Sequence, residues 1–129
     1  MSANLSQQAT RVYLVEDSAL IRERLAAMLR TLEGLEIVGE AEAPEAAIVG
    51  IKASRPDVVI LDLQLNGGSG LSVLRQLHDF APDVVPIVLT NYALPQFREE
   101  CLAAGAKYFF DKTTEFSKVC GAIETVCKR

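Results

Sequence analysis

The stretch Val58-Val59-Ile60-Leu61-Asp62 places four consecutive apolar residues, three of them β-branched, directly before a carboxylate. A run that is apolar at every position is typical of a parallel strand covered on both faces. Similar runs lead into other polar side chains: 12–15 precedes Glu16 and Asp17, 87–89 precedes Thr90, and 108–110 lies shortly before Lys112. Parallel strands end at one edge of their sheet, so these polar groups should converge there. Such a cluster is typical of a site for a divalent cation and a phosphoryl group.

The segments between these runs have helical periodicity, with apolar residues recurring mostly three and four apart. The expected helices follow Ser18 and stop by Gly34, run from Pro44 to before Pro56, include 71–77, extend from Pro95 to Gly105, and span 115–127. A further strand is expected at 36–41, and a glycine-rich loop at 66–70. Strand and helix therefore alternate five times, which predicts right-handed crossovers and helices on both faces of one parallel sheet.

Composition indicates one layered domain. The chain has 129 residues, of which 50% are hydrophobic, and this is enough for a single core. Residues 1–10 are polar and aperiodic, so we expect a mobile tail before a domain at 11–129. No apolar stretch reaches the ~18 residues that span a membrane, and the start lacks a signal-peptide pattern, so a cytoplasmic location without membrane contact is expected. A net charge of −4 argues against direct contact with nucleic acid.

The cysteines and the single histidine carry no evident chemistry. Cys101, Cys120 and Cys127 are odd in number and lack metal-binding spacing, so we expect reduced thiols on helices. His78 has no second ligand nearby in the sequence, and a solvated side chain is expected.

Short motifs mark the ends of the expected strands and helices. They are Glu16-Asp17-Ser18, the segment 56–63, Gly68-Ser69-Gly70-Leu71, Leu89-Thr90-Asn91, 103–106 and Asp111-Lys112. In this order and spacing, residues 11–127 resemble the receiver domain of bacterial two-component response regulators, the CheY-like family. The resemblance implies a flavodoxin-like, doubly wound (βα)5 domain with strand order 2-1-3-4-5.

The resemblance also implies a role for each acidic residue. Asp62 would be the phosphoacceptor for a sensor histidine kinase or a histidine phosphotransfer protein. Glu16 and Asp17 would hold Mg²⁺ or Mn²⁺ together with Asp62 and the backbone carbonyl of Gln64, and these oxygen ligands suit such ions. The alternative for an aspartate at a strand end is a helix cap, but the glycine-rich loop makes Ser69 the better cap after Asp62. Capping of the first helix by Ser18 or by Asp17 remains open as well.

Other positions match the family's phosphoryl-binding and switch residues. Lys112 would pair with Asp62 and then with the phosphoryl oxygens, and Thr90 would donate its hydroxyl to the phosphoryl group. Phe109 matches the aromatic switch position that responds to Thr90, although a plain core role is the alternative. Three further residues match positions that modulate access to the phosphoryl group, with exposed loop side chains as the alternative: Gln64, Asn91 and Tyr92.

The chain departs from the family pattern after the lysine. Thr113 stands where proline is common, and this variant resembles receivers of LuxR/NarL/FixJ-type regulators. We therefore expect a signalling phosphoacceptor with self-phosphorylation and autodephosphorylation chemistry rather than an enzyme. A homodimer and a fused or separate effector both remain open.

Two other functions stay as alternatives. A pseudo-receiver binds a partner without phosphorylation, but such proteins typically lose part of the acidic pair, the aspartate or the lysine. A phosphotransferase of the haloacid-dehalogenase type normally needs a second aspartate two residues after the first, where this chain has Gln64.

Overall fold

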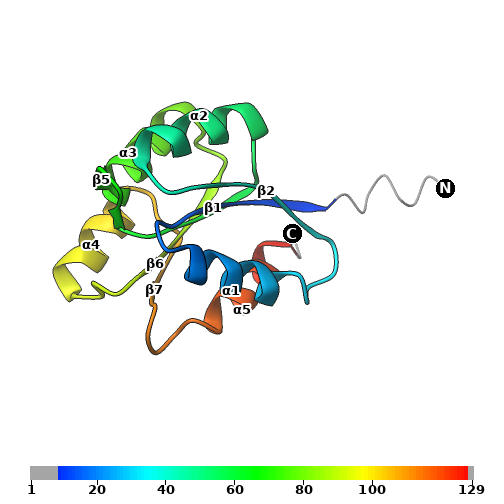
Figure 1. The fold of residues 1–129 in the computed structure, drawn as a ribbon. Helices are drawn as coiled ribbons and strands as arrows, with labels where there is room; N and C mark the ends of the chain where they lie inside the picture. Colours follow the sequence, from blue (N-terminus) through cyan, green and yellow to red (C-terminus); the bar gives the residue numbers. More distant parts are fainter. Residues whose placement is uncertain (1–8, 128–129) are drawn as a thin grey trace.

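Five parallel strands form one twisted sheet in the computed structural model, which describes residues 9–127 (Figure 1). The strands are β1 (Thr10–Val15), β2 (Leu35–Ala41), β3 (Val58–Leu61), β6 (Val85–Thr90) and β7 (Tyr108–Asp111). Their spatial order is β2-β1-β3-β6-β7. This order confirms the predicted 2-1-3-4-5 arrangement and the doubly wound α/β fold.

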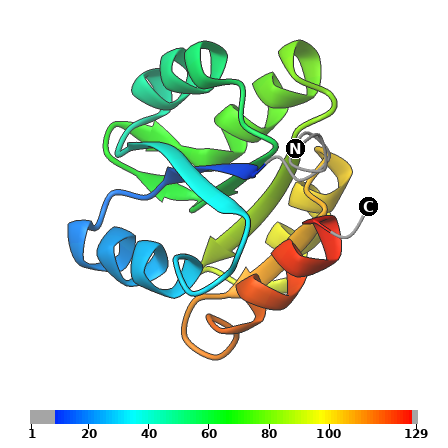
Figure 2. The ribbon, with the colours of Figure 1, turned by 90° about the vertical axis from the view of Figure 1, so that its right-hand side faces the viewer.

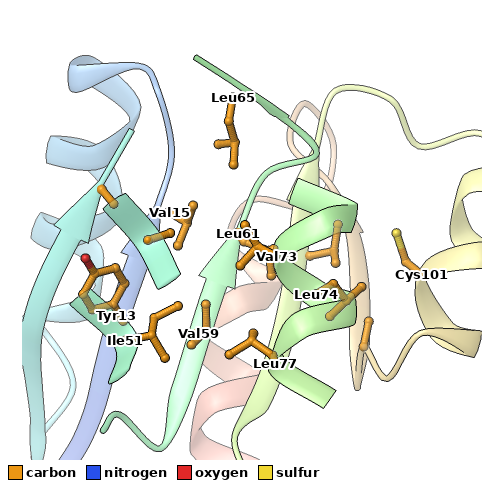
Figure 3. Close-up of a cluster of buried hydrophobic side chains, with 14 of the residues drawn as sticks. Tyr13, Val15, Ile51, Val59, Leu61, Leu65, Val73, Leu74, Leu77 and Cys101 are labelled. Atoms are coloured by element: carbon orange, nitrogen blue, oxygen red, sulfur yellow. The ribbon is translucent and has the colours of Figure 1, made fainter. Parts of the chain in front are cut away.

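Helices cover both faces of the sheet (Figures 1 and 2). One face packs against α1 (Ala19–Leu29) and α5 (Lys118–Cys127), and the other against α2 (Pro44–Ser54), α3 (Gly70–Phe80) and α4 (Pro95–Ala103). Within β3, Val59 and Leu61 join the cluster under α2, α3 and α4 (Figure 3), whereas Val58 and Ile60 join the cluster under α1 and α5. Burial on both faces explains why the strand sequences are apolar at every position.

The helix starts follow from local chemistry. The Ser18 hydroxyl accepts a hydrogen bond from the Ile21 N–H, and the Ser69 hydroxyl accepts one from the Leu71 N–H. Both serines are therefore N-caps, of α1 and α3. The Ser69 cap was predicted, and of the two residues left open for the first helix, Ser18 and Asp17, the cap is Ser18. Proline opens α2 and α4, where a missing N–H costs nothing.

Some boundaries differ from the prediction. The expected glycine-rich loop contains a short antiparallel hairpin of β4 (Gln64–Leu65) and β5 (Gly68–Ser69). Gly67 has φ +80 in its turn, which suits glycine. The first helix ends at Leu29, well before Gly34, and Leu20 in its first turn is 66% exposed.

The start of the chain and the last helix also differ. Strand β1 begins at Thr10, one residue before the expected domain start, and residues 1–8 of the expected tail lie outside the described residues. Helix α5 begins at Lys118 rather than at Glu115. The reason is that the Glu115 carboxylate accepts the Asp111 N–H, while the Asp111 carboxylate accepts the N–H groups of the two threonines after Lys112. These bonds favour turns over a helix.

Each of the three cysteines is free, and all three lie on helices. Cys101 is buried on α4, whereas Cys127 is exposed at the end of α5. His78 is exposed, as expected. None of the helices formed by residues 9–127 is long and apolar enough to cross a membrane.

Two glycines make room for the ring of Tyr13, which is only 4% exposed. A Cβ at Gly39 or at Gly50 would collide with atoms of that ring. The Tyr13 hydroxyl also donates a hydrogen bond to the Glu40 carbonyl, at 3.3 Å. The ring is therefore held on several sides and has little freedom to move away.

We predict that Gly50→Ala lowers the free energy of unfolding by about 1–2 kcal/mol. Overpacking against the rigid Tyr13 ring should fall in the upper part of the usual range of about 1–3 kcal/mol, and a better helix former returns only about 1 kcal/mol of this. Gly121→Ala is the matched control, because a Cβ there meets no atom within 4 Å. Urea unfolding should show the control to be as stable as the wild type or more so, and a stabilised Gly50→Ala would contradict the packing argument.

Candidate functional site

Three carboxylates meet at the carboxyl edge of the sheet. Glu16 and Asp17 follow β1, and Asp62 follows the adjacent strand β3. One oxygen from each lies within 4.8 Å of the others. Glu16 is 2% exposed and Asp62 is 5% exposed. The sheet therefore concentrates negative charge where the strand order reverses, which is where doubly wound folds bind ligands.

Lys112 brings the positive charge to this cluster. Its Nζ donates to Glu16 Oε1 at 2.8 Å and to Asp62 Oδ2 at 2.7 Å, and its side chain is only 8% exposed. The Lys112 N–H also donates to the Thr90 carbonyl at 2.9 Å. The backbone of Lys112, just after β7, is thus bonded to the end of β6, and its side chain extends to the two carboxylates.

The pKa values reflect this burial. Desolvation raises the pKa of Glu16, and this effect exceeds the opposing hydrogen bonds from Lys112 and from the Ser18 N–H. Desolvation alone would lower the pKa of Lys112, but its bonds to Asp62 and Glu16 outweigh it, and the pKa is raised. The ammonium therefore stays protonated at neutral pH, and the site as a whole favours added positive charge.

The backbone around Asp62 fixes the direction of its carboxylate. The Leu63 N–H donates to Asp62 Oδ1 at 2.6 Å. Gly70 opens α3 so close to Asp62 that a Cβ would collide with the Asp62 carbonyl oxygen. The Gly70 N–H also donates to the Leu63 carbonyl at 2.8 Å. Glycine is therefore required at this position to bring α3 against the loop that carries Asp62.

Thr90 and Phe109 lie on the adjacent strands β6 and β7, where Thr90 pairs with Asp111 and Phe109 pairs with Val88. Thr90 is fully buried, and its hydroxyl oxygen accepts the Tyr92 N–H at 3.1 Å. Phe109 is 5% exposed and packs in the cluster under α2, α3 and α4. The Arg98 guanidinium of α4 lies 6.0 Å from the Phe109 ring centre and donates to the Phe109 carbonyl at 3.2 Å. Phe109 is thus a core residue in this structure, with α4 attached to it.

An open cleft of about 540 Å³ lies over the carboxylates, and the structure places all three residues predicted to modulate access on its wall: Gln64, Asn91 and Tyr92. All three are also exposed. These three side chains therefore line the cleft and are exposed to solvent at once, so exposure does not separate the two alternatives given for them. The wall also includes Arg24, whose guanidinium lies 4.8 Å from the Phe116 ring centre, and neither residue was predicted to line the site.

Two supporting elements were not predicted. Arg22 donates to the Glu16 carbonyl at 2.7 Å, and the Asp111–Glu115 turn encloses the residue that bears the ammonium. A signal for the first was available, since Arg22 lies one helical turn after the N-cap Ser18. A signal for the second was the spacing of Asp111 and Glu115 on either side of Lys112 and Thr113.

The donor set fits Mg²⁺ or Mn²⁺. Both ions prefer oxygen ligands, and Mg²⁺ is commonly held by a few carboxylates plus waters and phosphate oxygens. Of the three clustered carboxylates, only Glu16 and Asp62 bond to the Lys112 ammonium, and burial has already raised the pKa of Glu16. A cation in this cluster would offset charge that Lys112 leaves unbalanced.

Comparison with known proteins adds an independent line of evidence. The family model described as response regulator receiver domain matches residues 12–124. The chain is 31% identical over 116 residues to the DNA-binding transcriptional activator DevR/DosR of Mycobacterium tuberculosis, and the match covers 90% of this chain and 54% of that protein. It is 35% identical over 123 residues to protein-glutamate methylesterase/protein-glutamine glutaminase 5 of Anaeromyxobacter dehalogenans, covering 95% and 30% respectively. The chain thus spans about half of the first relative and less than a third of the second.

Solved structures agree with this match. The signal receiver domain of the response regulator NarL from Mycobacterium tuberculosis superposes with a TM-score of 0.85 at 26% identity, covering 94% of this chain and 98% of that one. A chain of the CheX-CheY-BeF3-Mg complex from Borrelia burgdorferi gives 0.87 at 25% identity, covering 95% and 92%.

We predict that Lys112→Met lowers the free energy of unfolding by about 3 kcal/mol at pH 8, because two buried carboxylates lose their cation. In the folded protein the pKa of Glu16 is already raised, so the folded variant binds a proton more tightly than the unfolded chain does. Lowering the pH toward 4.5 should therefore restore part of the lost stability.

Unfolding of both proteins across this pH range measures the effect. Lys107→Met, at an exposed site, is the control and should change little. A loss for Lys112→Met that is the same at pH 5 and pH 8 would contradict the charge argument.

Proposed function

Because this chain belongs to the family of response regulator receiver domains, we propose that Asp62 accepts a phosphoryl group from a histidine kinase or a histidine phosphotransfer protein. The observation that carries the proposal is the position of Asp62. Its carboxylate lies at the end of β3, held by Lys112 and by the Leu63 N–H, at the cleft that Glu16 and Asp17 also line.

The transfer needs alignment more than covalent assistance. A carboxylate oxygen of Asp62 attacks the phosphorus of the partner's phosphohistidine, and an acyl phosphate bond forms. The phosphorus–nitrogen bond breaks, and its electron pair returns to the imidazole nitrogen of the partner. Lys112 then pairs with the phosphoryl oxygens instead of Asp62, and the Thr90 hydroxyl donates to one of them. Attack of water on the same phosphorus breaks the phosphorus–oxygen bond to Asp62, whose carboxylate keeps the electron pair, and inorganic phosphate leaves with the protons of the water, which resets the domain.

Glu16 and Asp17 would assist the phosphoryl transfer by holding a divalent cation. Glu16, Asp17, Asp62 and the backbone carbonyl of Gln64 would hold Mg²⁺ or Mn²⁺, which offsets the negative charge of the phosphoryl oxygens when bound. Because Asp62 belongs to the same cluster, the reacting carboxylate would stay at a fixed distance from the bound cation.

The switch runs from Thr90 to Phe109. When the Thr90 hydroxyl turns toward the phosphoryl group, the contact with the Tyr92 N–H is lost and space opens beside β7. Rotation of the Phe109 ring into that space would break its contact with Arg98 and change the surface of α4, β7 and α5. Thr113 keeps open a second route, through α1 and α5, as in LuxR/NarL/FixJ-type receivers.

The proposed function implies two kinds of binding partner. One is the protein that donates the phosphoryl group, and the other is either a second copy of the domain or an effector, fused or separate. A cytoplasmic location and a signalling role rather than an enzymatic one are part of the same proposal, and they rest on membership of the family. No contact of this domain with nucleic acid or with a membrane is required.

Neither alternative function is favoured. A pseudo-receiver would not need the acidic pair, Asp62 and Lys112 together, and these groups are in contact or clustered here. A phosphotransferase of the haloacid-dehalogenase type would need an aspartate at Gln64.

We predict that acetyl phosphate with Mg²⁺ adds one phosphate to the wild type and none to Asp62→Asn. Asp79→Asn, an exposed position on α3, is the control and should react like the wild type. Intact-mass measurement counts the adducts. A full phosphate adduct on Asp62→Asn would show that another group is the acceptor.

A second prediction concerns the cleft. Asn91 lies on its wall, so Asn91→Ala should speed both phosphorylation by acetyl phosphate and loss of the phosphoryl group. A barrier change of about 1 kcal/mol corresponds to several-fold in rate. Time courses by intact mass would measure both rates. Unchanged rates would mean that Asn91 only faces solvent, and slower phosphorylation would mean that its amide assists the reaction.

A further inference from the structure

Arg22 is a charged residue with a side chain only 14% exposed. It lies one helical turn into α1, and its guanidinium donates to three acceptors. Nη1 reaches the Glu16 carbonyl at 2.7 Å, Nε reaches Glu40 Oε1 at 3.2 Å, and Nη2 reaches Glu42 Oε2 at 3.3 Å. An arginine is rarely buried unless its donors are satisfied in this way.

The bond to the Glu16 carbonyl bears directly on Asp17. The Glu16 carbonyl and the Asp17 N–H belong to one planar peptide unit, so a donor that fixes the oxygen also fixes the plane from which Asp17 projects. From the other side, the Ser18 N–H donates to Glu16 Oε2 at 3.0 Å. The acidic pair is therefore held in one orientation by α1, although Asp17 is only half-buried.

The same network reaches the loop after Asp62. The Asn66 amide donates to Glu42 Oε1 at 3.1 Å, and the Asn66 N–H donates to the Glu42 carbonyl at 3.1 Å. Asn66 directly follows β4, the strand that contains Gln64. Arg22 and Asn66 thus contact the two oxygens of the same carboxylate, and this carboxylate connects the two loops that carry the acidic residues.

We propose that Arg22 is a positioning residue for the divalent-cation site: by holding the Glu16 carbonyl, and the Asn66 loop through Glu42, it keeps Asp17 and Asp62 in register to share one ion. This proposal rests on the proposed function, since it assumes that the acidic cluster binds a divalent cation.

Charge and position make opposite predictions for Arg22. Its positive charge lies near the acidic cluster, so through charge alone Arg22→Gln should bind a cation more tightly. If Arg22 positions the acidic pair, the same variant should bind the cation more weakly. Arg22→Lys separates the two effects further, because it keeps the charge but loses the planar fork that reaches three acceptors.

The test is calorimetric titration of the whole chain with MnCl₂. Arg22→Gln and Arg22→Lys should each raise the dissociation constant about tenfold, which is typical for loss of a group that orients metal ligands. Arg30→Gln is the matched control. It removes the same charge from an exposed position about 12 Å farther along the axis of α1, and its affinity should equal that of the wild type.

Unfolding in the absence of metal provides the second measurement. A purely structural role would lower the stability of Arg22→Gln and leave the affinity of its folded fraction unchanged, and this result would overturn the proposal. Affinity equal to or tighter than that of the wild type would overturn it as well. Failure of the wild type itself to bind Mn²⁺ would instead contradict the proposed function, so the two failures are distinguishable.

Asn66→Ala tests the connection between the loops. It should weaken Mn²⁺ binding less than Arg22→Gln does, since Glu42 keeps its bond to Arg22. In the double variant, the two effects should be less than additive, because both act through Glu42. Strict additivity would show that the Asn66 loop is independent of Arg22, and would overturn that part of the proposal.

Discussion

Negative charge buried at the end of a parallel sheet must be offset, and in this protein one ammonium, that of Lys112, offsets part of it. Lys112 bonds to Glu16 and Asp62 at once, and its own backbone is tied to Thr90. Removing carboxylates from water is costly unless they are paired and hydrogen-bonded. The need to pair these carboxylates therefore ties the ends of β1, β3, β6 and β7 together at this edge. The proposed chemistry depends on the same pairing, because the phosphoryl oxygens replace the Asp62 carboxylate as the partner of the Lys112 ammonium.

The strands and most of the site could be predicted because each leaves a local trace in the sequence. A strand covered on both faces must be apolar at every position, as Val58 to Leu61 is, and the polar residues that end such runs must meet if the strands are parallel. Ser18 and Ser69 were predictable as caps because their side chains bond only a few residues away. Strand order followed from the alternation of strands and helices together with family resemblance.

What could not be predicted depends on contacts between distant segments. The three acceptors of Arg22 belong to the first loop, to β2 and to the segment after it, and sequence periodicity does not show such pairings. The hairpin of β4 and β5 has strands of two residues each, too short to leave a pattern. The late start of α5 depends on bonds of the Asp111 and Glu115 side chains that compete with helix formation.

The two hydrophobic clusters lie on opposite faces of the sheet, and this gives the molecule a directional asymmetry. Phe109 belongs to the cluster under α2, α3 and α4, while its neighbours Tyr108 and Phe110 pack on the face of α1 and α5. The sheet therefore acts as a partition. A ring that moves on one side repacks against α4 at once, whereas the other side receives the disturbance only through the backbone. Binding of a partner on α4 would accordingly depend on how the side chains there are packed. Binding of a partner on α1 and α5 would depend on small shifts of whole helices.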